Sequence, residues 1–475
     1  MNQNPPTMNV IYLCTDTFRY DNVFGPDPLP TRTPYLDAFA AKSTVMDNMI
    51  MGSFPTVPQR TDVFTGRFGW PRYGWQHIDK SSPNRLAALF AQQGYATQLL
   101  CDCPHLFSNG FNQSFHGAEA VRGQEGDTHF LHLNDPIEEV MPPQKTRSGN
   151  HFEGRNLIDL HSWINHRRHY EGDLFMAQTA TRAMQWLEDN HKHDSFFLWV
   201  DFFDPHEPWD PPEYMVKRYD PDYAGTPMLH PNYGRADDLT PDELQNLAAH
   251  YYAESELVDR WIGRIIEKID DLELRENTLV VIISDHGMSL GEHNRTGKSN
   301  INDNDDRYWP TYPEVAHELL MIAGPGITPG RRLNLIAQPP DIAPTLMDFC
   351  SVDTEPPEPM HGRSFAPQLR GEAADELRDV AICASFLGPV CYDQVPNKAV
   401  TPTVYTHDWV YVPVGPEGQE ELYDRKTDRL AATNVIADHM DVAADMRGRL
   451  AAWLKEHDAP DGLEETLLNP AGKKS

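Results

Sequence analysis

The chain has 475 residues, of which 40% are hydrophobic and 23% are charged, and its formal net charge is −31. This length and composition suit one large α/β core with a smaller appended part, and they exclude a disordered or fibrous chain. The negative charge disfavours nonspecific binding to nucleic acid or to anionic membranes, so we expect neither as a partner. Any site for an anionic ligand therefore needs local positive charge, from a metal ion or from buried cations.

The sequence predicts neither a membrane span nor a signal peptide. No apolar run approaches the roughly 18 residues of a membrane span, and the apolar stretch 8–14 is too short for a signal peptide. The six cysteines are scattered and form no repeated Cys-x-x-Cys pairs, as in reduced cytosolic proteins. We therefore expect a cytoplasmic protein. Cys101 and Cys103 read better as incidental thiols than as a metal loop.

Strands and helices alternate along the first 350 residues. The apolar run 8–14 predicts a buried strand, followed by strands at 96–100, 195–200, 278–283 and 319–322. Helical patterns cover 85–93, 176–190 and 241–271, and a further helix starts after Asp341 as its N-cap. This alternation predicts an α/β fold with a largely parallel central sheet covered by helices.

The pattern changes after about Gly371. Shorter strands within 400–414 and a final helix near 442–455 predict a small C-terminal α+β subdomain. We therefore divide the chain into a main domain at 1–371 and a subdomain at 372–475.

Polar side chains follow the predicted strands directly. They are Asp16, Asp201, Asp204, Asp285 and His286. Ligands of parallel sheets bind at the carboxyl ends of the strands, so these residues predict a site. Carboxylate and imidazole ligands suit Zn²⁺ or Mn²⁺, and a bound dication lowers the pKa of a coordinated hydroxyl.

Residues 53–62 predict a turn that leads into a helix, with Thr56 just before it, Pro58 near its first position and Arg60 in its first turn. A threonine just before a helix is by itself an ordinary N-cap. The same position also suits a nucleophile and an oxyanion, because free backbone N–H groups and the positive end of the helix dipole lie there. Thr56 therefore needs partners before a catalytic role can be assigned.

Four motifs supply these partners, and together they resemble the motifs of the alkaline phosphatase/sulfatase superfamily. In chain order they are Asp16-Thr17-Phe18-Arg19-Tyr20-Asp21, then Thr56-Val57-Pro58-Gln59-Arg60 with Thr65-Gly66-Arg67, then Asp204-Pro205-His206-Glu207-Pro208-Trp209, and finally Ser284-Asp285-His286-Gly287 with Gly297-Lys298. The resemblance extends from Asn9 to about Leu454. It implies an alkaline-phosphatase-like sandwich with a sulfatase-like catalytic domain at 1–371.

The resemblance also implies a role for each matching residue. Thr56 would be both nucleophile and metal ligand, and Arg60 would stabilise the activated nucleophile and the transferring group. His206 and Lys298 would bind non-bridging oxygens or protonate the leaving group. The implied ligands of one divalent metal are Asp16, Thr56, Asp285 and His286, and we add His105 and His317 as substrate-binding candidates. For His105, a solvated or core-capping role remains the alternative.

Three residues depart from the sulfatase pattern. Sulfatases oxidise a cysteine or serine to formylglycine, whereas Thr56 has a secondary alcohol and cannot yield that aldehyde. Thr17 replaces the second acid of the first motif. Phosphonate monoester hydrolases, which resemble this site, carry a histidine where this chain has Asn300. Fewer anionic oxygen ligands favour Mn²⁺ or Zn²⁺ over Ca²⁺.

The sequence leaves three candidate functions. We favour a hydrolase of phosphoesters, either a phosphodiester or a phosphonate monoester, that forms a covalent intermediate on Thr56. The first alternative is a sulfuric ester hydrolase that uses the Thr56 alkoxide directly, and the second is a non-catalytic binding protein. The expected partner is a small-molecule ester, and the resemblance is compatible with a homo-oligomer.

Overall fold

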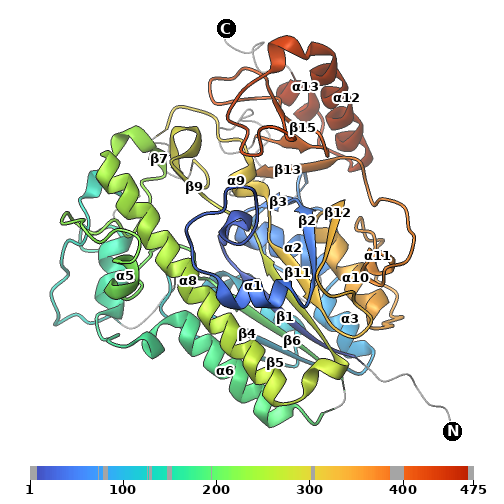
Figure 1. The fold of residues 1–475 in the computed structure, drawn as a ribbon, viewed down its shortest axis with the longest axis horizontal. Helices are drawn as coiled ribbons and strands as arrows, with labels where there is room; N and C mark the ends of the chain where they lie inside the picture. Colours follow the sequence, from blue (N-terminus) through green and yellow to red (C-terminus); the bar gives the residue numbers. More distant parts are fainter. Residues whose placement is uncertain are drawn as a thin grey trace.

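The computed structural model describes residues 8–72, 74–78, 84–125, 127, 131–146, 152–193, 195–300, 305–385 and 401–468. Its centre is an eight-stranded sheet with the order β12-β2-β11-β8-β1-β6-β4-β5 (Figure 1). The neighbouring strands run parallel except for β11, which is antiparallel to both β2 and β8. The strands are β1 (Asn9–Thr15), β2 (Thr44–Met49), β4 (Ala96–Cys101), β5 (Gly117–Ala120), β6 (Phe196–Phe202), β8 (Thr278–Ser284), β11 (Leu320–Ala323) and β12 (Arg331–Ala337).

The central strands are apolar on both faces because helices cover both faces. In β1, Tyr12 and Cys14 belong to the apolar cluster of one face, whereas Ile11 and Leu13 belong to that of the other. The first face packs against α2 (Thr56–Thr65), α3 (Leu86–Gln92), α4 (Pro104–Ser108), α10 (Ile342–Phe349) and α11 (Ala366–Leu369). The second face packs against α1 (Pro34–Ala40), α6 (Phe175–Asn190) and α8 (Pro241–Asp271).

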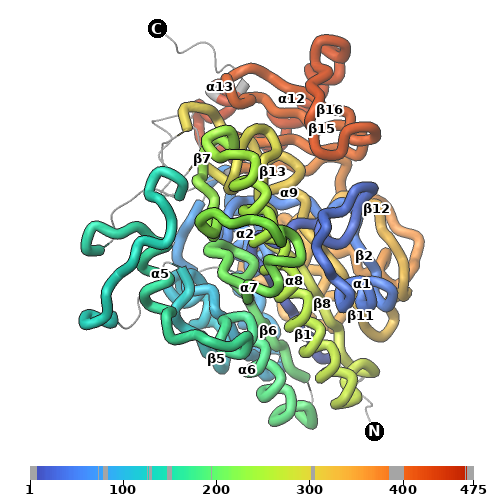
Figure 2. The backbone as a smooth tube through the Cα atoms, turned by 60° about the vertical axis from the view of Figure 1, so that its left-hand side comes forward, coloured from blue at the N-terminus to red at the C-terminus, as the bar shows by residue number. Residues whose placement is uncertain are grey.

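A second, five-stranded sheet lies at one end of the molecule, under the C-terminal helices (Figures 1 and 2). Its order is β16-β15-β14-β13-β3, and its last strand comes from the N-terminal part of the chain, just before α2. The strands are β3 (Ser53–Phe54), β13 (Ala381–Ser385), β14 (Thr403–Tyr405), β15 (Trp409–Val412) and β16 (Glu421–Asp424), and the helices are α12 (Met440–Glu456) and α13 (Leu463–Leu468).

Shorter elements complete the described chain. A three-stranded sheet joins β7 (Gly234–Arg235), β10 (Arg295–Gly297) and β9 (Ser289–Leu290). The remaining helices are α5 (Leu157–Asn165), α7 (Glu213–Val216) and α9 (Pro313–Ala316). Within the described residues, no helix combines the length and the apolar character that crossing a membrane requires.

The predicted α/β fold is confirmed, and most predicted elements lie within two residues of their observed bounds. The division at residue 371 stays a prediction, and the smaller sheet takes β3 from the first part of the chain. Asp341 does occupy the position before α10, but its carboxylate accepts from the backbone N–H groups of Gln338 and Arg363 rather than capping that helix. The five cysteines in the described ranges are free, and Cys391 lies outside those ranges.

Candidate active site

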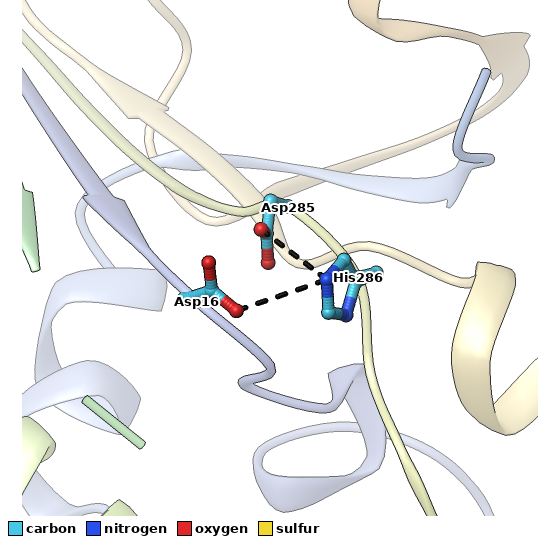
Figure 3. A group of neighbouring side chains, drawn as sticks. All are labelled: Asp16, Asp285 and His286. Carbon is cyan, nitrogen blue, oxygen red and sulfur yellow. Dashed lines mark ion pairs between the residues drawn. The ribbon is translucent and has the colours of Figure 1, made fainter. Parts of the chain in front are cut away.

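The register of two neighbouring strands brings the predicted metal ligands together. Strands β1 and β8 pair in parallel, with Thr15 opposite Ser284, so the next residues, Asp16 and Asp285, leave the sheet side by side. His286 follows directly. One donor atom from each of Asp16, Asp285 and His286 lies within 4.8 Å of the others (Figure 3). The Nε2 atom of His286 is 3.7 Å from Oδ1 of Asp16 and 3.4 Å from Oδ2 of Asp285.

The unsatisfied polar atoms of this cluster fit a divalent cation. Both carboxylate oxygens of Asp16 and the Nε2 atom of His286 are buried without a hydrogen-bond partner among the described residues. The Nδ1 atom of His286 donates to the carbonyl of Gly287 at 3.0 Å, which leaves the lone pair on Nε2. Burial lowers the pKa of His286 to about 3, and burial together with the Asp285 charge raises the pKa of Asp16. A cation would satisfy these atoms, because buried polar groups otherwise lack compensation.

Thr56 begins helix α2, at the end of the strand layer where the cluster lies. It is 2% exposed, and Pro55 rather than Thr56 occupies the N-cap position, one residue earlier than the sequence predicted. The side chain of Arg60, one turn further along, connects Thr56 with the cluster. Its Nη1 atom donates to the Thr56 carbonyl at 3.2 Å and to Oδ2 of Asp285 at 2.5 Å, and it lies 3.3 Å from Oδ2 of Asp16.

Asp201 holds the Arg60 guanidinium from the other side, a role that the sequence did not reveal. The Nε atom of Arg60 donates to Oδ2 of Asp201 at 2.9 Å, and Nη2 donates to Oδ1 at 2.9 Å. Such a two-point contact fixes the plane of the guanidinium. The sequence feature that pointed to Asp201 was its carboxylate near the end of β6, a strand whose other residues are apolar.

Lys298 and His206 lie beside the cluster, but they differ in charge and in hydrogen bonding. The Lys298 ammonium is 3.7 Å from Oδ1 of Asp16 and has no hydrogen-bond partner in the described part of the chain. The Nδ1 atom of His206 donates to the Glu207 carbonyl at 2.6 Å. Burial, followed by the Lys298 charge, lowers the pKa of His206 well below its usual value. Neutral His206 thus offers a lone pair at Nε2, so Lys298 is the donor that is ready for an anionic substrate.

The two other predicted histidines lie in different places. His105 contacts the rings of Trp75 and Phe203 edge-on, with centroids 4.8 and 5.7 Å away. Its pKa is lowered to about 4 by burial, and the Asp16 charge opposes this shift, so His105 lies within electrostatic range of the cluster.

His317 is not brought to the cluster. Its ring stacks on Tyr20 with centroids 3.8 Å apart, and Nε2 bonds to the carbonyl of Asp47 at 3.0 Å. It lines a separate cavity of about 950 Å³ together with Arg332 and Arg429. Burial and then the charge of Arg425 lower the pKa of His317, and no ligand of the cluster is among the causes. The strand after His317 is β11, whose antiparallel direction was not predicted from the sequence.

The other two residues that depart from the pattern, Thr17 and Asn300, have structural roles of their own. Thr17 has a φ of +60°, which is unusual for a β-branched residue, and its backbone N–H donates to Oδ1 of Asp285 at 3.0 Å. The backbone thereby orients a ligand at the position where a second acid would stand. Asn300 is buried, and its Nδ2 atom donates to the carbonyl of Asp305 at 2.8 Å.

Comparison with known proteins gives one family match and several distant relatives. The family model described as Sulfatase matches residues 8–352. An arylsulfatase K from Mus musculus is 24% identical over 95% of this chain and 79% of its own length. An endo-4-O-sulfatase from Bacteroides thetaiotaomicron is 24% identical over 78% of this chain and 74% of its own length.

A solved structure carries a different activity in its name. The phosphonate monoester hydrolase of Agrobacterium radiobacter superposes with a TM-score of 0.71 at 19% identity, over 95% of this chain and 96% of that one. At this identity the superposition shows the fold. Sulfatases and a phosphonate hydrolase therefore share the architecture, and the choice between sulfur and phosphorus depends on the residues of the site.

Proposed function

The chain belongs to the sulfatase family, and we propose that within it the protein hydrolyses phosphoesters, either phosphodiesters or phosphonate monoesters, through a covalent intermediate on Thr56. The observation that carries this proposal is a threonine at the start of α2, one helical turn before the buried Arg60. The family's formylglycine cannot form from this side chain.

The residues around Thr56 suit one divalent metal. Asp16, Asp285 and His286 would hold it together with the Thr56 hydroxyl, and we propose Mn²⁺ or Zn²⁺ rather than Ca²⁺ because the set contains an imidazole and only two carboxylates. When bound, the metal would lower the pKa of the Thr56 hydroxyl and polarise the ester.

The protein's own cations supply the remaining charge stabilisation. Arg60 is held rigidly by Asp201 and points its Nη1 atom toward the Thr56 carbonyl and the cluster. Lys298, whose ammonium has no hydrogen-bond partner among the described residues, offers that ammonium to a non-bridging oxygen of the substrate. Such fixed donors stabilise developing negative charge without reorganising during the reaction.

The reaction then takes two steps. The Thr56 hydroxyl loses its proton as its oxygen forms a bond to phosphorus, the bond to the leaving oxygen breaks, and that oxygen gains a proton and departs as an alcohol. Water then attacks the same phosphorus, the bond to the Thr56 oxygen breaks, and threonine recovers its proton. Nucleophilic catalysis of this kind divides one difficult displacement into two easier ones.

The intermediate favours phosphorus over sulfur. A formylglycine hydrate has a second hydroxyl whose collapse expels sulfate, so no external water is needed. Thr56 has only one hydroxyl. A sulfated Thr56 would have to be cleaved by water, as would a phosphorylated one, and a divalent metal held by the cluster would polarise the phosphoryl oxygens and so favour attack of water at phosphorus.

Sulfuric ester hydrolysis by the Thr56 alkoxide is the second candidate function. It is supported by the sulfatase names of the curated relatives at 24% identity. A purely binding protein is disfavoured, because Asp16, Asp285 and His286 are all present and their donor atoms converge.

Turnover of three matched aryl esters tests the proposal. The metal-loaded enzyme is assayed with an aryl phosphodiester, an aryl phosphonate monoester and an aryl sulfate that share one leaving group. We expect kcat/KM to be higher for at least one phosphorus ester than for the sulfate, and we expect Thr56→Ala to abolish that activity. Fast sulfate turnover with negligible turnover of both phosphorus esters would replace this proposal by the second candidate.

A further inference from the structure

A second group of potential metal ligands lies outside the predicted site. It consists of Glu125, Glu207 and His230, and one donor atom from each lies within 4.8 Å of the others. The three residues come from three separate segments: the loop after β5, the loop after β6 and the segment before β7. All three side chains are buried. Chain segments so far apart in the sequence converge here on one small volume.

One hydrogen bond fixes the orientation of the His230 ring. Its Nδ1 atom donates to the carbonyl of Pro231 at 2.7 Å, so the neutral ring carries its lone pair on Nε2. This Nε2 atom is 3.5 Å from Oε2 of Glu125 and 4.0 Å from Oε1 of Glu207. His230 is 0% exposed, and its Nε2 atom has no hydrogen-bond partner within the described ranges.

Glu207 also directs an unsatisfied atom toward this volume. Its Oε1 atom accepts from the Tyr233 hydroxyl, whereas Oε2 is buried without a hydrogen-bond partner among the residues that the structure describes. A buried carboxylate is costly unless a cation neutralises it. Among the Lys and Arg side chains in the described ranges, the nearest to Oε2 is the Lys298 ammonium at 3.9 Å, beyond hydrogen-bond distance.

The spacing fits an ion. Two ligands bound about 2.1 Å from a tetrahedral Zn²⁺ lie about 3.4 Å apart, close to the 3.5 Å between His230 and Glu125. We propose that Glu125, Glu207 and His230 bind a second divalent cation, Zn²⁺ or Mn²⁺. Two carboxylates with one neutral imidazole form a ligand set that suits either metal.

The second site adjoins the first through Lys298. The ammonium is 3.7 Å from Asp16 of the first cluster and 3.9 Å from Glu207 of the second. A cation on Glu207 would offset the carboxylate charge that faces Lys298, which leaves the ammonium for an anionic substrate. The second site goes beyond the proposed ester hydrolysis and does not depend on it, because its ligands bind a cation whichever ester is cleaved.

Counting bound metal ions tests this site in the full-length protein. The chain is stripped with a chelator, titrated with Zn²⁺ or Mn²⁺ by calorimetry, desalted and analysed for metal. We expect two ions per wild-type chain, one in His230→Gln, one in Asp285→Asn and none in the double variant.

The matched control is His293→Gln. His293 likewise lies beside a glutamate, but it is only partly buried and both of its ring nitrogens are already bonded, to Glu314 and to the Ala431 carbonyl. This variant should keep two ions.

The possible results separate the alternatives. If His230 is instead protonated on both nitrogens and forms an ion pair with the two glutamates, wild type and His230→Gln bind the same single ion, and the proposal is wrong. Two ions retained in His230→Gln would also overturn it, because the second ion would then lie elsewhere. Glu207→Gln gives an independent reading if His230→Gln fails to fold: one ion supports the site, and two contradict it. No substrate enters the assay, so failure of the ester proposal does not affect the count.

Discussion

Lys298 carries a buried ammonium, and its nearest carboxylates among the described residues, Asp16 and Glu207, lie 3.7 and 3.9 Å away. Neither distance is that of a hydrogen bond. Within the part of the chain that the structure describes, no hydrogen bond therefore engages its charge. In a chain with a net charge of −31, such a local cation is what an anionic substrate requires.

Replacing Lys298 by alanine should impair catalysis without removing the metal. We expect kcat/KM to fall by about 10²–10³-fold, the scale of a lost transition-state donor. Metal content should stay unchanged, because a protonated lysine is a poor ligand. Steady-state kinetics and metal analysis of the purified variant check both parts. Lys426→Ala is the matched control, since Lys426 is exposed and pairs with Asp408. Loss of the metal together with Lys298 would show that the lysine supports the metal site instead.

At the scale of elements, Asp62 connects helix α2 to the segments on either side of it. Its buried carboxylate accepts from the N–H and the hydroxyl of Ser53, at 2.8 and 2.9 Å, and from the N–H of Gly69 at 2.7 Å. The first of these segments is β3, directly before Thr56, and the second is the turn after α2. One side chain thus holds the start and the end of helix α2, which begins at Thr56, in place.

Asp62→Ala should destabilise the protein by roughly 3 kcal/mol, because it leaves several buried donors without an acceptor. Urea unfolding curves of the variant and the wild type measure this difference. Thr61→Ala is the control at the next position. Its hydroxyl only donates to the Val57 carbonyl within the same helix, and its loss should cost less than about 1 kcal/mol. Equal effects of the two substitutions would contradict the role of Asp62.

The central elements were predictable because long periodic or apolar runs determine them. β1, β6 and β8 are buried on every residue, and the capping box of Thr240 with Glu243 marks the start of α8. β2 and β12 were missed, since Asp47 and Asn48 interrupt the first and two arginines open the second. These strands gain their stability from pairing with each other, which local sequence does not show.

The candidate site was predictable only where its residues follow strands. Asp16, Asp285 and His286 each do so, and the strand register brings them together. Asp201 was also predicted as a polar residue after a strand, but its contact with Arg60 depends on tertiary structure, as does the group of Glu125, Glu207 and His230. His317 precedes a strand that the sequence predicted. The antiparallel direction of that strand, β11, and the stacking of His317 on Tyr20 nevertheless place it in a cavity separate from the cluster.

At the scale of the whole molecule, the two sheets are not independent. β3 pairs with β13, with Ser53 opposite Ala384, so the strand before Thr56 is the edge of the C-terminal sheet. Phe54 belongs to an apolar cluster that includes Tyr405 and Val410 of the C-terminal sheet. The position of the proposed nucleophile is therefore set by both parts of the chain.

A fragment that ends at residue 371 should not fold into an active unit. Its β3 would lose the pairing with β13, and the apolar side chains around Phe54 would face water. We expect an aggregated or unfolded fragment by size-exclusion chromatography and circular dichroism. A soluble fragment that unfolds cooperatively and binds metal would contradict this expectation and establish residues 1–371 as an autonomous domain.

His293 also links the two parts of the molecule, and it does so in a pH-dependent way. Its Nδ1 atom bonds to Glu314 at 2.9 Å and its Nε2 atom to the Ala431 carbonyl at 2.9 Å. Burial lowers the pKa of His293, but the Glu314 charge and hydrogen bond outweigh it, so the pKa is raised. The pKa of Glu314 is correspondingly lowered to about 2: burial raises it, and the charge of His293 more than offsets this.

The sign of the pH effect follows from these shifts. The native state holds the His293 proton more tightly, so this stabilisation is complete below the unfolded pKa of about 6.5 and is lost as pH rises through the raised value. On the acid side, the Glu314 contribution is lost as pH falls from about 4.5 toward 2. His293→Gln should therefore lower the Tm most at pH 6 and less at pH 9, by calorimetry at fixed metal concentration. A difference that stays constant or grows with pH would contradict the pairing.

The central claim is that Thr56 attacks phosphorus and carries the covalent intermediate, and trapping that intermediate tests it most directly. The metal-loaded enzyme is mixed with an aryl phosphonate monoester or an aryl phosphodiester, quenched in acid within milliseconds and examined by mass spectrometry. Before mixing, the intact mass should correspond to unmodified threonine. After quenching, the peptide that contains Thr56 should carry the phosphonyl or phosphoryl group, and Thr56→Ala should show neither adduct nor turnover. Wild-type turnover by Thr56→Ala, or an adduct on another residue, would contradict the account.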